Sequence, residues 1–206
     1  MFFRPMHHKT AGLSYNPLKA IVSPRPIGWI ASKGADGSHN LAPYSFFNAI
    51  SEDPAMVMFS VMAVQPNHRK DTLRNVEETG EFVVNIVSQI QFDAMNISSG
   101  DFAYGDNEFA RAGLKMVPSE TVSVPRASDV PAALECTHYK TLPLPANDDG
   151  VSYTVVIGSV TGIYVDDRIV EDGLVKYDRF VPISRLGYRD YGRVTDVFQA
   201  NRPSQD

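Results

Sequence analysis

The sequence predicts a mainly β protein, built as a closed or nearly closed antiparallel barrel with a few short helices inserted between its strands. Short, apolar, β-prone segments recur along the chain and outnumber the segments with helical periodicity. Strands and helices alternate too sparsely for a doubly wound parallel sheet. The long predicted strand 152–165 contains Gly158 and Gly162, and glycine inside a strand is typical of the bends and bulges that a barrel requires.

The first predicted element is a hairpin. Segment 27–32 is short and apolar, and the two prolines that precede it prevent a helix. Residues 34–38 have the glycine and aspartate content of a hairpin turn. The returning segment, 39–47, contains Pro43, which cannot donate a hydrogen bond to a sheet, so we expect a sheet edge or a bulge there.

The middle of the chain predicts a buried strand and an amphipathic helix. Segment 55–61 is nearly all apolar, which predicts a strand buried on both faces. Segment 70–80 predicts a helix with Leu73 and Val76 on its buried stripe and Gly80 as its C-terminal cap. The other predicted elements are a turn at 52–54, strands 81–87, 132–140 and 152–165, helices 89–96 and 190–200, a loop at 98–106 and a frayed tail at 201–206.

Length and composition predict one domain. The chain has 206 residues, of which 43% are hydrophobic, and this is enough for a substantial core. No internal repeat or linker divides it. We therefore expect residues 1–206 to form one unit, with an N-terminal arm at 1–17, the barrel with its helices at 18–198 and a tail at 199–206.

Charge and cysteine content exclude several classes of protein. Nineteen Lys and Arg residues against 24 Asp and Glu residues leave a formal net charge of −5, so neither nucleic acid nor a membrane is an expected partner. The single cysteine, Cys136, excludes an internal disulfide, a CxxC motif and a thiolate zinc site, and its apolar strand pattern predicts a buried, inert thiol. No apolar run reaches the roughly 18 residues of a membrane span, and the N-terminus lacks the apolar core of a secretory signal. We expect a cytoplasmic protein.

The start of the predicted helix 70–80 is a candidate phosphate site. Arg69, Lys70 and Thr72 lie there, where free backbone N–H groups and the helix dipole attract anions. Cations at this end of a helix cost stability unless an anion is bound. The same residues also fit a solvated basic turn in which Asp71 or Thr72 only caps the helix.

An aromatic segment follows Pro43 in the predicted edge strand. Tyr44, Phe46 and Phe47 alternate with Ser45 and are closed by Asn48. Aromatic surface beside amide and hydroxyl groups suits a planar ligand such as a flavin ring. The same pattern also fits an ordinary core strand.

Other motifs are weaker. Arg25 is held between two prolines, which suits binding of a phosphate or carboxylate but equally a rigid connection. The five histidines show no metal-binding spacing, so no metal site is predicted. GxSxG, P-loop and GxGxxG motifs are all missing from the sequence, so a nicotinamide cofactor would not bind through a Rossmann fingerprint.

Six short segments, in order along the chain, together carry a resemblance to a known family. They are Ser-Pro-Arg-Pro-Ile-Gly-Trp-Ile-Ala-Ser (23–32), Asn-Leu-Ala-Pro-Tyr-Ser-Phe-Phe-Asn (40–48), Arg-Lys-Asp-Thr-Leu-Arg-Asn (69–75), Gly-Glu-Phe-Val-Val-Asn (80–85), Ala-Leu-Glu-Cys (133–136) and Ile-Ser-Arg-Leu-Gly (183–187). Each segment alone is a weak motif, but six in register are specific. On these residues the chain resembles the flavin reductase-like family of FMN-binding split barrels, and within it flavoredoxin-type proteins and the reductase components of two-component monooxygenases.

The resemblance implies a six-stranded antiparallel split barrel that forms a homodimer, with FMN near the subunit interface. It implies that Arg69, Lys70 and Thr72 hold the phosphate, with His68 available nearby. The residues implied to contact the cofactor are Arg25, Trp29, Ala31, Ser32, Tyr44, Ser45, Phe46, Phe47, Asn48, Arg69, Lys70, Asp71, Thr72, Arg185 and Leu186. The loop 96–106 is expected to help determine what reaches the flavin.

The resemblance implies an FMN-dependent NAD(P)H oxidoreductase. Hydride would pass from NADH or NADPH to FMN, or to FAD in its place, and reduced flavin or electrons would pass to a monooxygenase or another acceptor. Because the flavin carries the chemistry, no side chain is expected to act as an essential acid or base. Two alternatives stay open: an electron-transfer flavoprotein without direct NAD(P)H turnover, and a non-catalytic flavin-binding module.

Overall fold

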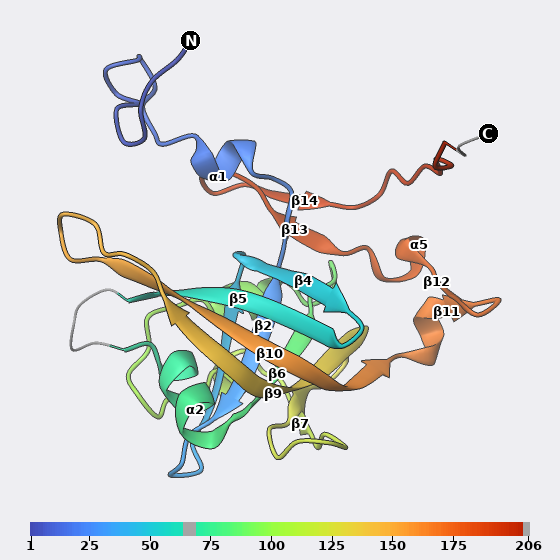
Figure 1. The fold of residues 1–206 in the computed structure, drawn as a ribbon. Coiled ribbons are helices and arrows are strands. Elements are labelled where there is room, and N and C mark those ends of the chain that lie inside the picture. The colour runs from blue at the N-terminus through green and yellow to red at the C-terminus, as the bar shows by residue number, and fades with distance from the viewer. Residues whose placement is uncertain (64–68, 204–206) are drawn as a thin grey trace.

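A seven-stranded antiparallel sheet dominates the part of the chain described by the computed structural model, residues 1–63 and 69–203 (Figure 1). Its strands are, in spatial order, β3 (His39–Tyr44), β2 (Gly28–Lys33), β6 (Glu81–Ile86), β9 (Ala132–Pro143), β10 (Ser152–Val165), β5 (Ala55–Ala63) and β4 (Phe47–Glu52). All neighbouring strands in this order pair antiparallel. The mainly β, antiparallel prediction is therefore confirmed.

The two edge strands of this sheet are consecutive in the sequence. β3 ends at Tyr44 and β4 begins at Phe47, so Ser45 and Phe46 alone connect one edge of the sheet to the other. The sheet must curl to bring these edges together. No described residues of β3 pair with β4, so the sheet stays open between them. The expected count of six strands and a closed barrel are not confirmed.

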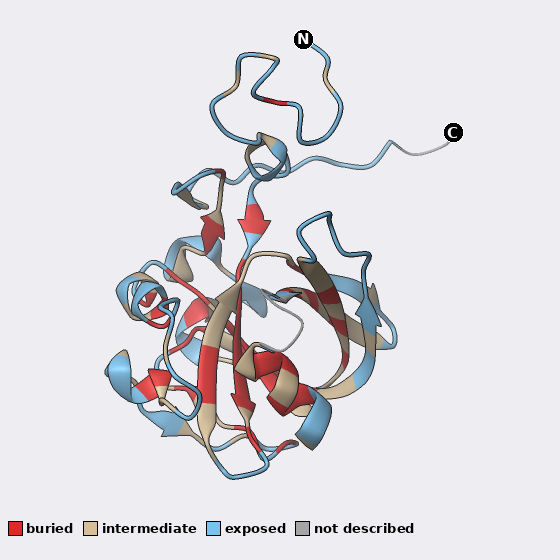
Figure 2. Cartoon of the chain, turned by 90° about the vertical axis from the view of Figure 1, so that its left-hand side faces the viewer, coloured by how far each residue is buried: buried red, intermediate tan, exposed pale blue. Residues whose placement is uncertain are grey.

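Two apolar clusters lie on opposite faces of the central strands. On β2, Trp29 belongs to the first cluster and Ile30 to the second, as expected where successive side chains point to opposite faces. Helix α2 (Asp71–Thr79) adds Leu73 and Val76 to the second cluster, so the predicted stripe is confirmed. Figure 2 shows buried positions concentrated in the sheet, whereas both terminal segments are mostly exposed.

Shorter elements surround this core. The other helices are α1 (Leu18–Ile21), α3 (Phe92–Ile97), α4 (Glu108–Arg111), α5 (Tyr177–Phe180) and the 3₁₀ turn η1 (Asp167–Ile169). The small sheets are β1 (Arg25–Pro26), β13 (Ile183–Arg185) and β14 (Tyr191–Arg193), then β7 (Met116–Val117) with β8 (Arg126–Ala127), and β11 (Val170–Glu171) with β12 (Leu174–Val175). Within the described ranges, none of the helices is long and apolar enough to span a membrane.

Several local predictions are confirmed. Pro43 lies in β3, an edge strand of the sheet. Gly80 ends α2 with φ of 76°, the left-handed conformation that favours glycine. The β9–β10 pairing shifts register between Ile157 and Gly158 and again between Val160 and Gly162, so the predicted bulges are present.

Three local predictions are wrong. The returning strand expected at 39–47 ends at Tyr44, and Phe47 begins a separate strand, β4, at the other edge of the sheet. Strand β5 is buried on one face only, because none of the described residues form a layer over its outer face, which includes Met58 and stays half-exposed. The helix expected at 190–200 is absent: Tyr191–Arg193 pairs with β13, and the exposed segment after it has no partner surface that would stabilise a helix.

Candidate active site

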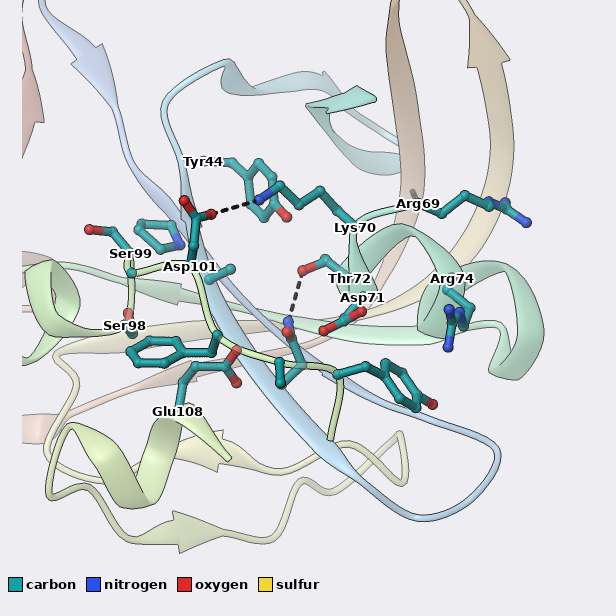
Figure 3. Close-up of a pocket in the computed structure, with 17 residues that line it drawn as sticks. Tyr44, Arg69, Lys70, Asp71, Thr72, Arg74, Ser98, Ser99, Asp101 and Glu108 are labelled. Atoms are coloured by element: carbon teal, nitrogen blue, oxygen red, sulfur yellow. Dashed lines mark hydrogen bonds and ion pairs between the residues drawn. The ribbon is translucent and has the colours of Figure 1, made fainter. Parts of the chain in front are cut away.

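A cavity of about 520 Å³ opens between the edge strand β3, the start of α2 and the loop that follows α3 (Figure 3). Its lining is Asn40, Ala42, Pro43, Tyr44, Arg69, Lys70, Asp71, Thr72, Arg74, Ser98, Ser99, Gly100, Asp101, Phe102, Ala103, Tyr104 and Glu108. The volume lies within the range of small-molecule sites. The predicted helix start therefore meets Tyr44, the first residue of the predicted aromatic segment, at one cavity.

Tyr44 is the aromatic wall of this cavity. Its ring packs 5.2 Å, centroid to centroid, from the buried ring of Phe59, which fixes the side chain from below. Burial raises the pKa of the Tyr44 hydroxyl to about 12, and the neighbouring Thr72 hydroxyl opposes part of that shift. The phenol is therefore neutral at physiological pH and can donate a hydrogen bond to a ligand.

A buried polar network holds the wall in place. The Asn40 side-chain amide lies 2.8 Å from the Thr72 hydroxyl and joins β3 to α2. The backbone N–H of Leu41 donates to Glu108 Oε2 at 3.0 Å, which ties β3 to α4. Burial raises the pKa of the Glu108 carboxyl. This network sets the position of Thr72, which is only 1% exposed, relative to the strand edge.

Cations gather at the start of α2. Lys70 Nζ lies 3.2 Å from Asp101 Oδ1 across the cavity (Figure 3). Arg69 pairs instead with Glu77, and its side chain points away from the cavity. Arg74, one turn further along the helix, stacks on the ring of Tyr104 with 4.2 Å between Cζ and the ring centroid.

These donors fit the phosphate of a flavin mononucleotide. Helix α2 has nine residues, and its first two, Asp71 and Thr72, line the cavity, so the positive end of the helix dipole, which the N–H groups of the first turn carry, lies at the cavity. Lys70 and Thr72 add an ammonium group and a hydroxyl beside them. Tyr44 and Pro43 supply a flat apolar wall for a ring system in the same cavity.

Several predicted contact residues lie outside the cavity lining. Trp29 and Ala31 are completely buried. The Trp29 indole N–H donates to Ser98 Oγ at 2.8 Å, and this bond anchors the start of the loop that follows α3. Ser32 is also buried and accepts from the Asn75 amide at 3.2 Å. Phe47 belongs to the second core cluster. As flavin contacts, these residues stay predictions.

The connection between the sheet edges also lies outside the lining. Ser45 and Phe46 are half-buried and Asn48 is exposed. The Phe46 ring packs 5.9 Å from that of Tyr153. Their roles toward flavin likewise stay predictions, and His68 lies outside the described residues.

Arg25, Arg185 and Leu186 lie together in the small sheet β1-β13-β14 and its adjoining turn, apart from the cavity lining. The Arg25 guanidinium donates to the backbone carbonyl of Leu186 at 2.7 Å and to those of Lys19 and Val22. Arg185 donates to the carbonyls of Tyr188 and Asp190. Within one chain, both arginines tie backbone segments together.

Among the lining residues that the sequence prediction did not single out, Asn40, Arg74, Tyr104 and Glu108 make contacts that shape the cavity. Arg74 had a usable signal, because it follows Lys70 by four positions and residues so spaced share a helix face. Tyr104 falls inside the predicted loop, whose composition does not show which side chain points inward. Asn40 and Glu108 meet through long-range packing that no local pattern reveals.

Comparisons with known proteins match this arrangement. The family model described as "Flavin reductase like domain" matches residues 22–184. An uncharacterized protein of Aquifex aeolicus is 39% identical over 178 residues, covering 86% of this chain and 88% of its own.

Two solved structures are similar over nearly the whole chain. Nitrilotriacetate monooxygenase component B of Bacillus cereus is 30% identical with a TM-score of 0.88, covering 97% of this chain and 98% of its own. The 2-nitrobenzoate 2-nitroreductase of Pseudomonas fluorescens is 32% identical with a TM-score of 0.81, covering 98% and 97%. Sequence, fold and site geometry agree, and this chain belongs to the flavin reductase-like family.

Proposed function

We propose that this protein is an FMN-binding reductase that oxidises NADH or NADPH and passes the electrons to a separate acceptor. The observation that supports this most strongly is the meeting of Lys70, Thr72 and Tyr44 at one cavity. Phosphate donors and a flat aromatic wall from distant parts of the chain are together what an FMN site needs.

In this proposal, Lys70, the Thr72 hydroxyl and the positive end of the α2 dipole hold the phosphate. Tyr44 bounds the ring system and stays protonated, because burial raises its pKa to about 12. Asn40 and Glu108 fix the position of Thr72 relative to the edge strand β3. Bound FMN supplies the redox chemistry, accepting a hydride from reduced nicotinamide and delivering electrons onward.

The proposed acceptor is a separate protein, such as a monooxygenase, or a small molecule. The support is the 30% identity, over nearly the full length of both chains, with a protein named as monooxygenase component B. The similarity to a 2-nitroreductase supports a small aromatic acceptor as the other candidate.

We further propose that the protein acts as a homodimer. An apolar groove of about 540 Å³ is lined by residues of β4, β5, β9 and β10, which include Ile50, Met56 and Ile163. Ile50 is 48% exposed and Ile163 is 66% exposed, which is costly for an uncovered surface. Native mass spectrometry reports subunit number and bound flavin together, and a monomer would contradict this part of the proposal.

The phosphate assignment is tested by titration of the purified protein with FMN. The double variant Lys70→Ala/Thr72→Ala is expected to weaken FMN affinity at least about tenfold, which corresponds to roughly 1.4 kcal/mol. Lys115→Ala, which removes the same charge from an exposed position outside the cavity, is the matched control. Unchanged affinity in the double variant would move the phosphate elsewhere.

The enzymatic claim has its own test. Anaerobic stopped-flow mixing of the FMN-loaded protein with NADH or NADPH is expected to bleach the flavin absorption. Tight FMN binding without bleaching by either nucleotide would instead favour an electron-transfer flavoprotein that needs a partner reductase.

A further inference from the structure

Arg74 is a cation of the cavity without a carboxylate partner. Among the described residues, no Asp or Glu lies within ion-pair distance of its guanidinium, whereas Arg69, Lys70 and Arg111 are each paired. The contact that Arg74 does make is with a ring: its Cζ lies 4.2 Å from the centroid of Tyr104. Both residues line the cavity. A cation without a counter-ion, in a cavity wall, favours an anionic ligand.

The ring below Arg74 is itself fixed. The Tyr104 hydroxyl donates to Asp36 Oδ2 at 3.2 Å, in the turn between β2 and β3. Asp36 also accepts from the hydroxyl of Ser38 at 2.6 Å and from its N–H at 2.9 Å. The loop after α3, the β2–β3 turn and helix α2 therefore meet at the pair of Arg74 and Tyr104. Stacking orients the planar guanidinium, so its N–H donors are presented along fixed directions.

The position of Arg74 places it apart from the proposed flavin phosphate. Thr72 and Asp71 lie between Lys70 and Arg74 in the close-up view (Figure 3). Lys70 is the N-cap of α2, and the N–H of Arg74, one turn further on, donates to the Lys70 carbonyl at 3.1 Å. Two cations therefore lie near the N-terminus of the helix, where positive charge is unfavourable. FMN carries one phosphate, for which Lys70 and Thr72 suffice. The second cation calls for a second anionic group.

We propose that Arg74, held on Tyr104, binds the 2′-phosphate on the adenosine of NADPH and makes the protein prefer NADPH to NADH. The proposal rests on the proposed function, since it assigns the reductant of that same site. In Rossmann folds a carboxylate binds the ribose hydroxyl of NADH and an arginine accommodates the 2′-phosphate of NADPH, and the pairing of arginine with phosphate does not depend on that fold. Tyr104 is 43% exposed, so the pair is open to a nucleotide that enters from solvent.

The test compares nucleotide binding in matched variants. Dissociation constants of NADP⁺ and NAD⁺ are measured by calorimetry on the FMN-loaded protein, and KM values for NADPH and NADH by steady-state kinetics. Arg74→Ala is expected to weaken NADP⁺ at least about tenfold and to leave NAD⁺ within about twofold. Arg74→Lys is expected to recover part of the NADP⁺ affinity, because it keeps the charge without the planar fork.

Arg111→Ala is the matched control. Arg111 also lies over a ring, 5.2 Å from the centroid of Phe102, but it is paired with Asp106 and lies outside the cavity lining. The Arg111→Ala substitution is expected to leave the dissociation constants of both NADP⁺ and NAD⁺ unchanged. Thermal unfolding of each variant shows whether it is folded.

Three outcomes would overturn the proposal: no NADPH preference in the wild type, equal loss of both nucleotides in Arg74→Ala, or a loss of affinity for FAD with nucleotide discrimination intact. The last would assign Arg74 to a second flavin phosphate. FMN affinity is measured on the same samples. If the wild type binds no FMN, the proposed function is wrong. If it binds FMN but shows no preference for NADPH, only the assignment of Arg74 is wrong.

Discussion

The ammonium nitrogen of Lys70 lies 3.2 Å from Asp101 Oδ1, so the start of α2 and the loop after α3 are joined across the cavity. Asp101 is almost fully exposed, with 97% of its side chain accessible. An exposed pair of this kind adds little to stability. The contact matters because it occupies the cation proposed to hold the flavin phosphate.

Asp101→Asn is therefore expected to bind FMN roughly two- to fivefold more tightly than the wild type, the size expected of one exposed charge interaction. The variant removes a competing acceptor and a negative charge beside the phosphate. Titrations at low and at high salt check this, because screening should shrink the difference. Weaker FMN binding by Asp101→Asn at low salt would argue against Lys70 as the phosphate ligand.

Ser98→Ala is expected to lower the free energy of unfolding by about 1–3 kcal/mol. It removes the acceptor of the buried Trp29 indole N–H, and a buried donor without a partner carries its full desolvation cost. Ser99→Ala is the neighbouring control, since the Ser99 hydroxyl is exposed and, among the described residues, bonds only the carbonyl of Asn96. Urea unfolding of both variants measures the contrast, and equal effects would contradict the role given to Ser98.

Gly158→Ala is expected to destabilise the fold by about 1–3 kcal/mol through overpacking. A Cβ at this position would overlap the ring of Phe82, which is completely buried and packs at 5.4 Å, ring centroid to ring centroid, on Phe59. Gly192→Ala is the control, because the nearest atom to its added Cβ is a Leu186 side-chain carbon at 3.5 Å, an ordinary contact. Thermal unfolding separates the two, and a neutral Gly158→Ala would show that Phe82 can move.

The buried carboxyl of Glu108 is expected to make the free energy of unfolding depend on pH. Burial raises the pKa of its carboxyl, so the folded state holds the proton more tightly than the unfolded chain. Its contribution to stability is therefore largest below the ordinary carboxyl pKa of about 4.3 and is lost as pH rises through the folded-state pKa. Glu108→Gln cannot titrate.

The difference in unfolding free energy, wild type minus Glu108→Gln, is accordingly expected to fall across that pH window and to level off above it. Urea unfolding at a series of pH values measures this difference. A difference that rose with pH would mean that the Leu41 N–H outweighs burial and lowers the pKa of Glu108 instead.

Local elements were the predictable part of the fold. The start and end of α2, the hairpin turn and the irregular β9–β10 pairing at Gly158 and Gly162 all follow from residues within a few positions. The predictions that failed depend on distant partners. Tyr191–Arg193 is a strand because β13 lies beside it, and Met58 is half-exposed because none of the described residues cover that face of β5.

The candidate site divides in the same way. Sequence by itself determined the family resemblance, the cations before α2 and the aromatic segment at an edge, because turn residues, helix starts and prolines act locally. Tertiary structure alone decided that Tyr44 lines the cavity while Trp29 is buried beneath it. It alone placed Tyr104 on Arg74, thirty positions earlier in the chain, since strand pairing and core packing set which loop meets which helix.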